Sequence, residues 1–215
     1  MTIQDIYEQY KIMPSLQQHM YRVSGVAALI CDSLNEKVDR TAILTACLLH
    51  DMGNILKFNL DLFPTFLEPE GRDYWQQVQD EYRAKYGNDE HIATVAIAKD
   101  LHVESKVIDL IDSILFSYAR ANFESTDFNR KIAAYSDMRV EPMGVVTLAA
   151  RLDDGNKRFK INKPNEAAKH DFFQEMARYL SQIEAQIFTK TELQPTDITN
   201  EKVDQYQKEL MNWPI

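Results

Sequence analysis

The spacing of apolar residues along the chain predicts helices rather than strands. Apolar side chains recur at alternating intervals of four and three residues, which is the repeat of a helix with one buried face. The first clear helix follows Pro14 and reaches about Leu34. Similar patterns lie at about 70–87, 89–101, 104–120, 129–139, 142–153, 165–188 and 200–211. Since no segment shows strand alternation, we expect an all-α fold of about eight to nine helices.

A helix beginning after Asp39 is apolar around most of its girth. Asp39 is a suitable N-cap, and the pattern predicts a helix that reaches about Phe58. A helix without a polar face belongs in the interior of a protein, so this one is expected to be the most buried. Two polar residues near its end, His50 and Asp51, therefore require an explanation.

Two segments interrupt the helical pattern. Residues 59–69 contain Pro64 and Pro69 and indicate an irregular connection. Residues 155–165, with the sequence GNKRFKINKPN, indicate a long loop. This loop divides the chain into a predicted core domain at 14–155 and a C-terminal helical extension at 156–215 that packs on the core.

Composition supports a helical chain and excludes one kind of phosphate site. The chain has only 6 glycines and 7 prolines in 215 residues, fewer than sheet proteins use in their turns. The glycines are also too widely spaced for a dinucleotide fingerprint or a P-loop. A phosphate cradled by a glycine-rich loop is therefore excluded.

Charge and cysteine content indicate the type of partner and the compartment. With 24 basic and 33 acidic residues, the net charge of −9 disfavours duplex nucleic acid and anionic membranes. No apolar run is long enough to span a bilayer. The two cysteines form no CxxC pair, which suits a reducing compartment. We expect a cytoplasmic protein with a small-molecule partner.

The pair His50-Asp51 is the first candidate for chemistry. A buried carboxylate beside an imidazole is costly unless it is paired or bound to a metal. Gly53 follows three residues after His50, and we expect the space above the imidazole to be occupied. A structural ion pair, with Gly53 permitting close helix packing, explains the dipeptide equally well.

Two further polar residues lie on predicted apolar faces. His19 shares a helix face with Leu16 and Met20, and Asp137 follows the buried stretch around Ala133. Taken singly, they could be a core histidine and a charge at a helix end. Convergence with His50 and Asp51 would satisfy all these buried polar groups at once, which favours a metal site.

The order H…HD…D resembles the HD-domain metal-dependent phosphohydrolase superfamily. Its elements are His19 in HMYRV, His50-Asp51 in LLHDMGN and Asp137 in AAYSDMRV, over residues 14–155. The resemblance implies an all-helical bundle in which these four residues hold divalent metal and Asp51 takes part in catalysis. Asp153 and Asp154 compete for the last ligand position, where sequence context favours Asp137. Mixed nitrogen and oxygen ligands admit Mn, Fe, Co, Ni, Zn or Mg.

The chain departs from this family at the residue expected to contact phosphate. Many members have lysine in the motif HDxGK, whereas this chain has Asn54. Lys57 is a candidate substitute, and Arg22 matches the family's H-x-x-R-V start. Arg139 is a third candidate, although an internal salt bridge explains either arginine equally well.

The number of metals depends on His91. Binuclear relatives, including di-iron oxygenases on this fold, add two histidines, and His91 fits the first of these positions. The second is expected near residues 114–117, which read ILFS without a histidine. We therefore expect one metal per chain. His91 is then a partial ligand, a proton donor to the leaving group, or an ordinary helix-start histidine.

These observations predict a hydrolase that uses metal-activated water on a small phosphoester or nucleotide. The alternative is a non-catalytic binding or regulatory domain that contains a metal, which the missing lysine favours. A di-iron oxygenase is a further alternative. The apolar face over residues 165–188 indicates added core or a homodimer contact. A basic run attracts an anionic substrate or forms a solvated surface; it comprises Lys157, Arg158, Lys160 and Lys163.

Overall fold

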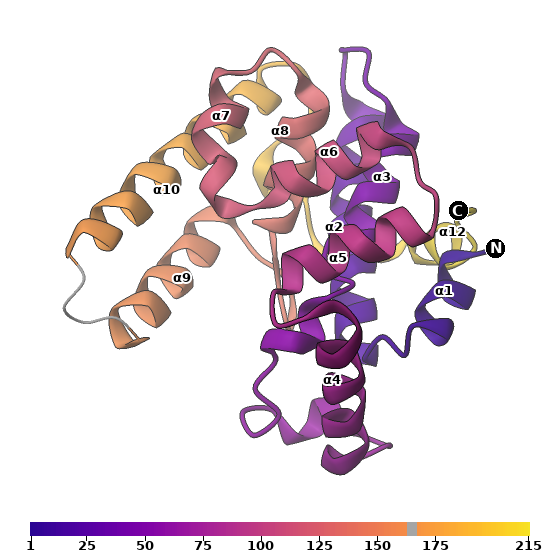
Figure 1. The fold of residues 1–215 in the computed structure, drawn as a ribbon. Helices are drawn as coiled ribbons and strands as arrows, with labels where there is room; N and C mark the ends of the chain where they lie inside the picture. The colour runs from indigo at the N-terminus through magenta and orange to yellow at the C-terminus, as the bar shows by residue number, and fades with distance from the viewer. Residues whose placement is uncertain (163–166) are drawn as a thin grey trace.

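The computed structural model describes the backbone of residues 1–162 and 167–215 and the side chains of residues 1–158 and 169–215. The all-α expectation is confirmed, with twelve α-helices in this part of the chain rather than eight or nine (Figure 1). The helices are α1 (Ile3–Gln9), α2 (Pro14–Ser33), α3 (Arg40–Leu49), α4 (Arg72–Tyr86), α5 (Glu90–Asp100), α6 (Ser105–Ile114), α7 (Ala119–Glu124), α8 (Phe128–Asp137), α9 (Leu148–Asn162), α10 (Ala167–Phe188), α11 (Asn200–Asp204) and α12 (Gln207–Met211).

Helices α2, α3, α6 and α8 pack together as the centre of the fold (Figure 1). Every residue of α3 from Ala42 to Leu49 is buried, which agrees with the prediction that this is the most buried helix. Asp39 caps its start by accepting a hydrogen bond from the backbone N–H of Ala42. The buried helix delivers its last turn, and the His50-Asp51 pair that follows, to the inside of the protein.

The predicted extension of this helix to about Phe58 is wrong, since α3 ends at Leu49. After His50 the chain turns and forms a short 3₁₀ helix, Asn54–Lys57. The turn brings Gly53 against α5, where its N–H donates to the Thr94 hydroxyl at 2.9 Å. This contact with a segment forty residues away replaces continuation of the helix.

A helix predicted at 142–153 begins later, and a β-hairpin occupies its first residues. Strand β1 (Val140–Glu141) pairs antiparallel with β2 (Gly144–Val145), and α9 starts only at Leu148. Pro142 lies in the turn, and Gly144 has a φ of 153°, which suits glycine. The backbone N–H of Val145 also donates to Asn200 of α11, so a distant segment holds the hairpin.

The predicted loop at 155–165 is wrong for residues 155–162, which continue α9. The remaining residues of that prediction lie outside the described backbone. Two acid-base pairs at four-residue spacing support the helix, Asp153–Lys157 and Asp154–Arg158, each 2.6 Å apart. An acid four residues before a base favours a helix. The predicted boundary between residues 155 and 156 therefore falls inside a continuous helix.

The irregular connection and the polar helix after it follow the sequence expectation. Residues 59–69 contain a second 3₁₀ helix, Pro64–Leu67, and α4 ends at Gly87 with a φ of 87°. Glycine adopts this left-handed conformation without strain. The segment and α4 lie together at one end of the molecule (Figure 1).

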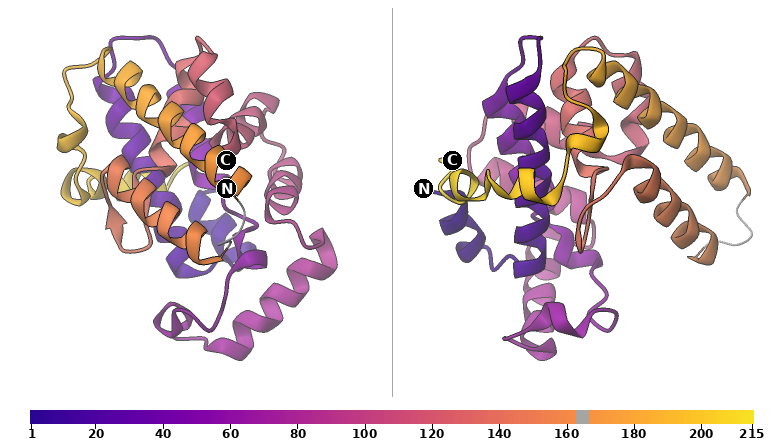
Figure 2. Two further views of the ribbon diagram at one scale, coloured as in Figure 1. Left: turned by 90° about the vertical axis from the view of Figure 1, so that its left-hand side faces the viewer. Right: turned by 180° about the vertical axis from the view of Figure 1, so that it is seen from behind.

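The C-terminal region packs on the core at two places. Helix α10 lies against α7 and α8, and α11 and α12 lie against α2. Helices α9 and α10 project together from the body of the protein (Figure 2). The two termini lie side by side, because the Ile215 N–H donates to the Met1 carbonyl oxygen at 3.0 Å. No helix in the described part of the chain is long and apolar enough to cross a bilayer.

Candidate metal centre

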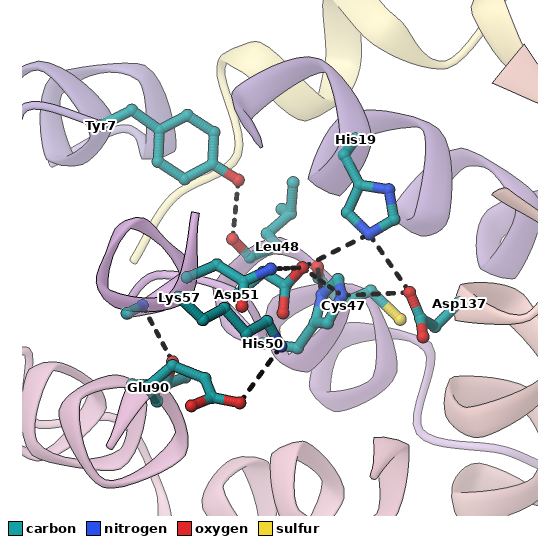
Figure 3. A network of polar contacts seen from close by, with 12 residues as sticks. Tyr7, His19, Cys47, Leu48, His50, Asp51, Lys57, Glu90 and Asp137 are labelled. Carbon is teal, nitrogen blue, oxygen red and sulfur yellow. Dashed lines mark hydrogen bonds and ion pairs between the residues drawn. The ribbon is translucent and has the colours of Figure 1, made fainter. Parts of the chain in front are cut away.

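The four predicted ligands converge from three helices onto one point (Figure 3). His19 is on α2, His50 caps α3 with Asp51 next to it, and Asp137 ends α8. The Nε2 atom of His19 lies 3.2 Å from Oδ1 of Asp137 and 3.5 Å from Oδ2 of Asp51. The Nε2 atom of His50 lies 3.4 Å and 3.7 Å from the same two oxygens.

One imidazole is oriented by the end of its own helix. Nδ1 of His50 lies 2.8 Å from the carbonyl oxygen of Cys47, so Nδ1 donates and Nε2 keeps its lone pair in the neutral ring. The Cys47 carbonyl is one of the acceptors that a helix leaves unpaired at its C-terminus. Nε2 is buried and has no hydrogen-bond partner among the described residues. It therefore faces the two carboxylates as an available ligand atom.

The cluster holds ionisable groups at positions where burial and the helix dipole disfavour charge. Asp137 lies at the C-terminus of α8, where the helix dipole repels an anion. Its burial opposes ionisation, but the hydrogen bond with His19 and the adjacent imidazole of His50 keep the pKa of Asp137 well below its usual range. Burial likewise lowers the pKa of His50, and the carboxylates of Asp51 and Asp137 raise it more, to about 9. The two carboxylates thus favour a positive charge beside them, either on an imidazole or on a bound metal ion.

The donor set fits a divalent metal. Ligand atoms of His19, His50 and Asp51 all lie within 4.8 Å of one another. Neighbouring ligand atoms around a cation with bonds of about 2.1 Å are themselves about 3.0–3.4 Å apart. The nitrogen–oxygen distances of 3.2–3.7 Å are close to that range. Imidazole with carboxylate suits transition metals in general, so the donors do not select one ion.

Asn54 holds one of the carboxylates. Its Nδ2 donates to Oδ2 of Asp51 at 2.7 Å. The residue that replaces the lysine of HDxGK therefore orients a metal ligand instead of reaching for phosphate.

Asn54→Ala is expected to weaken metal binding by about 10–100-fold, since removing a group that orients a ligand typically has this effect. Isothermal titration of the metal-free protein with Mn²⁺ measures the change. Asn156→Ala on α9 is the matched control, because Asn156 lies outside the pocket lining and hydrogen-bonds to Gln174. Unchanged affinity in Asn54→Ala would contradict the orienting role.

The space beside Gly53 is occupied, as expected, but by the protein's own chain. A Cβ atom at residue 53 would overlap the carbonyl oxygen of Glu90 and lie 2.8 Å from the Cβ of Ala93. The space is filled by the backbone of α5. Glycine here permits close packing of the His50-Asp51 turn on α5. This is the packing role that the sequence analysis gave as the alternative for Gly53.

A pocket of about 360 Å³, within the range of small-molecule sites, opens beside the candidate metal ligands. Three of its lining residues have a buried polar atom with no hydrogen-bond partner among the described residues: Ser15 Oγ, Asn54 Oδ1 and Arg151 Nε. Unpaired buried polar atoms are unfavourable, so they indicate a bound ligand or water. The lining comprises Ser15, Leu16, His19, Asp51, Asn54, Lys57, Phe58, Phe63, Phe66, Asp137, Val140, Pro142, Arg151 and Arg158.

Of the other predicted site residues, only Lys57 lines this pocket. Its Nζ contacts Glu90 at 3.2 Å. Arg22 donates to the carbonyl oxygen of Pro142 at 3.3 Å and is not among the lining residues. His91 also lies outside the lining, with Nε2 2.8 Å from Asp112. Of these three residues, Lys57 is therefore the one placed to contact a ligand in the pocket, and Arg22 and His91 are not.

Arg139 is a structural residue. Its side chain is buried and donates to the carbonyl oxygens of Val146, Pro195 and Ile198 and to the Tyr135 hydroxyl. The alternative of an internal role is thus correct for Arg139, although its partners are carbonyl and hydroxyl oxygens rather than a carboxylate.

Arg151 and Arg158 are the two basic lining residues that the sequence analysis did not name as site residues. Arg158 was noted only as part of a basic run, and Arg151 only as part of a later helix. Their seven-residue spacing puts them on one side of a helix. That signal was hidden because residues 155–165 were interpreted as a loop.

The fold and this cluster define an all-helical protein with a candidate site for a divalent cation. The chain belongs to the HD domain family, whose model matches residues 16–155 and so spans all four predicted ligands. Members commonly are hydrolases that bind divalent metals. Searches of curated proteins and of solved structures give no significant match.

Proposed function

We propose that this protein is a metal-dependent phosphohydrolase acting on a small phosphoester or nucleotide. The observation that carries the proposal is the pocket, which combines the metal-binding residues with three cations. Apart from Asp51 and Asp137, its charged lining residues are Lys57, Arg151 and Arg158. An anionic substrate suits such a pocket even though the whole chain carries a net charge of −9.

The residues of the chain would divide the work of hydrolysis. A divalent cation held by His19, His50, Asp51 and Asp137 would supply an activated water and polarise the phosphoryl group. Asn54 fixes the Asp51 carboxylate, and the Cys47 carbonyl fixes the His50 ring.

The rest of the pocket would bind and shield the substrate. Arg151 and Lys57 would bind phosphoryl oxygens and neutralise charge that grows in the transition state. Phe58, Phe63 and Phe66 would exclude water from the leaving-group side.

Arg151 is the stronger candidate for the phosphate contact. Its side chain is only 20% exposed, its Nε has no partner among the described residues, and its nearest acidic contact is Asp154 at 3.8 Å. Lys57 is 55% exposed and already contacts Glu90. A guanidinium can also bind two phosphoryl oxygens at once.

Arg151→Gln is expected to lower kcat/KM by about 100-fold while metal content stays at the wild-type level. The assay uses p-nitrophenyl phosphate and a set of nucleoside monophosphates with Mn²⁺-loaded protein. Arg22→Gln is the matched control, because the geometry predicts little change there whereas the sequence-based assignment predicts a loss. A loss in Arg22→Gln with none in Arg151→Gln would contradict the assignment.

The proposed activity itself is tested with the same assay. Turnover that disappears on metal removal and returns on reloading is the expected result. Absence of turnover with one metal per chain would favour the non-catalytic alternative.

Among the described residues, a single cluster of three or more candidate ligands is found, and His91 is paired with Asp112. A di-iron oxygenase therefore has no supporting observation.

A further inference from the structure

Arg151 and Arg158 lie on the same side of α9, two turns apart. Seven residues of helix correspond to about 10 Å along the axis. Both line the pocket that contains the metal-binding residues. Arg158 lies beyond residue 155, where the family match ends.

The two arginines share a carboxylate that lies outside the pocket lining. Asp154 Oδ2 lies 2.6 Å from Nη2 of Arg158 and 3.8 Å from Nη1 of Arg151. Asp154 comes three residues after Arg151 and four before Arg158, so it lies between them on the helix. This arrangement aligns both guanidinium groups and leaves their remaining N–H groups available to the pocket.

The arginines differ in depth. The side chain of Arg151 is 20% exposed, whereas that of Arg158 is 56% exposed. Helix α9 runs outward from the body of the protein (Figure 2). Arg151 therefore marks the inner part of the pocket, and Arg158 marks its outer part.

Three phenylalanines form an aromatic part of the pocket wall outside α9. Phe63 and Phe66 are stacked with ring centroids 5.1 Å apart, and both line the pocket with Phe58. Phe63 is 46% exposed, so an apolar surface extends to the mouth. A ligand that reaches from the metal-binding residues to Arg158 would pass this surface.

The charges of the lining residues also indicate a ligand with more than one anionic group. A divalent cation would balance Asp51 and Asp137, and the remaining charged lining residues are all basic. Arg151 alone can form a bidentate contact with one phosphoryl group. Arg158, two helical turns away, is too distant to share that contact. Its ion pair with Asp154 is made through Nη2, and its other N–H groups can bind a second anion.

We propose that the pocket binds phosphoesters carrying a second anionic group. The phosphoryl group that reacts lies at the metal-binding residues beside Arg151, the middle of the ligand lies along Phe63 and Phe66, and the second anionic group pairs with Arg158. This inference rests on the proposed function for the identity of the inner group. It adds the class of substrate, namely bisphosphates and phosphoesters with a distal phosphate or carboxylate.

The test compares two ligands that cannot be hydrolysed, hexylphosphonate and hexane-1,6-bisphosphonate. They have the same chain and inner group and differ only in the second anion. Calorimetry with Mn²⁺-loaded wild-type protein is expected to show at least about tenfold tighter binding of the bisphosphonate. Arg158→Gln should reduce this ratio to near one and leave hexylphosphonate affinity within about twofold. Arg151→Gln should weaken both ligands.

Arg120→Gln is the matched control, because Arg120 on α7 pairs with Glu124 at the same four-residue spacing and lies outside the pocket. It should retain the wild-type ratio. Equal affinities for the two ligands in the wild type, binding of neither, or a preference that survives in Arg158→Gln would overturn the proposal. Because neither ligand reacts, failure of the proposed hydrolase activity would be seen separately, as absent turnover with the bisphosphonate preference intact.

Discussion

Asp137→Asn is expected to remove bound metal from the protein. The variant keeps the size of the side chain and loses the charge that lies 3.2 Å from His19 and 3.4 Å from His50. A neutral amide is a much weaker ligand than a carboxylate for a divalent cation, and loss of one of four ligands should lower affinity by at least about 100-fold. Elemental analysis after gel filtration should find about one metal per wild-type chain and almost none in the variant.

The competing aspartate provides the control for this experiment. Asp153, which sequence alone allows as the last ligand, is 61% exposed and pairs with Lys157 on α9. Asp153→Asn should therefore keep wild-type metal content. Equal metal in Asp137→Asn and the wild type would remove Asp137 from the site. A loss in Asp153→Asn alone would transfer the assignment to α9.

Gly53→Ala is expected to destabilise the fold by about 2–4 kcal/mol, the cost of forcing an added methyl group into a packed interior. The new Cβ would overlap the Glu90 carbonyl oxygen, and backbone on α5 cannot move aside as a flexible side chain can. Separation of the two segments would also lengthen the hydrogen bond from Gly53 to Thr94. Urea unfolding monitored by circular dichroism measures the change.

Gly155→Ala is the matched control, since it makes the same replacement in a less crowded place. Residue 155 lies within α9, and its nearest neighbours would be atoms of the Phe173 ring at 3.3 and 3.4 Å. The helical preference of alanine over glycine, about 1 kcal/mol, offsets this mild contact. A free energy of unfolding for Gly53→Ala within about 0.5 kcal/mol of the wild type would show that α5 can shift to accommodate the methyl group. That result would contradict the packing argument.

The local pattern of apolar and polar residues was sufficient to predict the central helices of the fold. The apolar stripe after Pro14 and the apolar helix after Asp39 correspond to α2 and α3, and the residues that end α4 were also predicted. These features depend on neighbours within a few turns, where helical periodicity and capping act directly. The sequence did not predict α1 or the β-hairpin, both of which contact distant segments. The continuous α9 was also missed, although its acid-base pairs lie only four residues apart.

The candidate site likewise contains residues that could be predicted from the sequence and residues that could not. His19, His50, Asp51 and Asp137 could be chosen from sequence because polar residues on apolar helical faces are costly unless they are brought together. Their convergence is seen in the structure. Which cations face the pocket could not be chosen, since a position on a helix does not state which neighbour that side of the helix meets.

The sequence by itself therefore determined the helical class, the buried central helices and four candidate metal ligands. The tertiary structure alone decided that Gly53 packs on α5 and that Arg22 contacts Pro142. It also decided that Arg151 and Arg158 line the pocket. The physical reason is range: periodicity and the cost of burying charge are read from adjacent residues, whereas the walls of a pocket come from segments that meet only when the whole chain has packed.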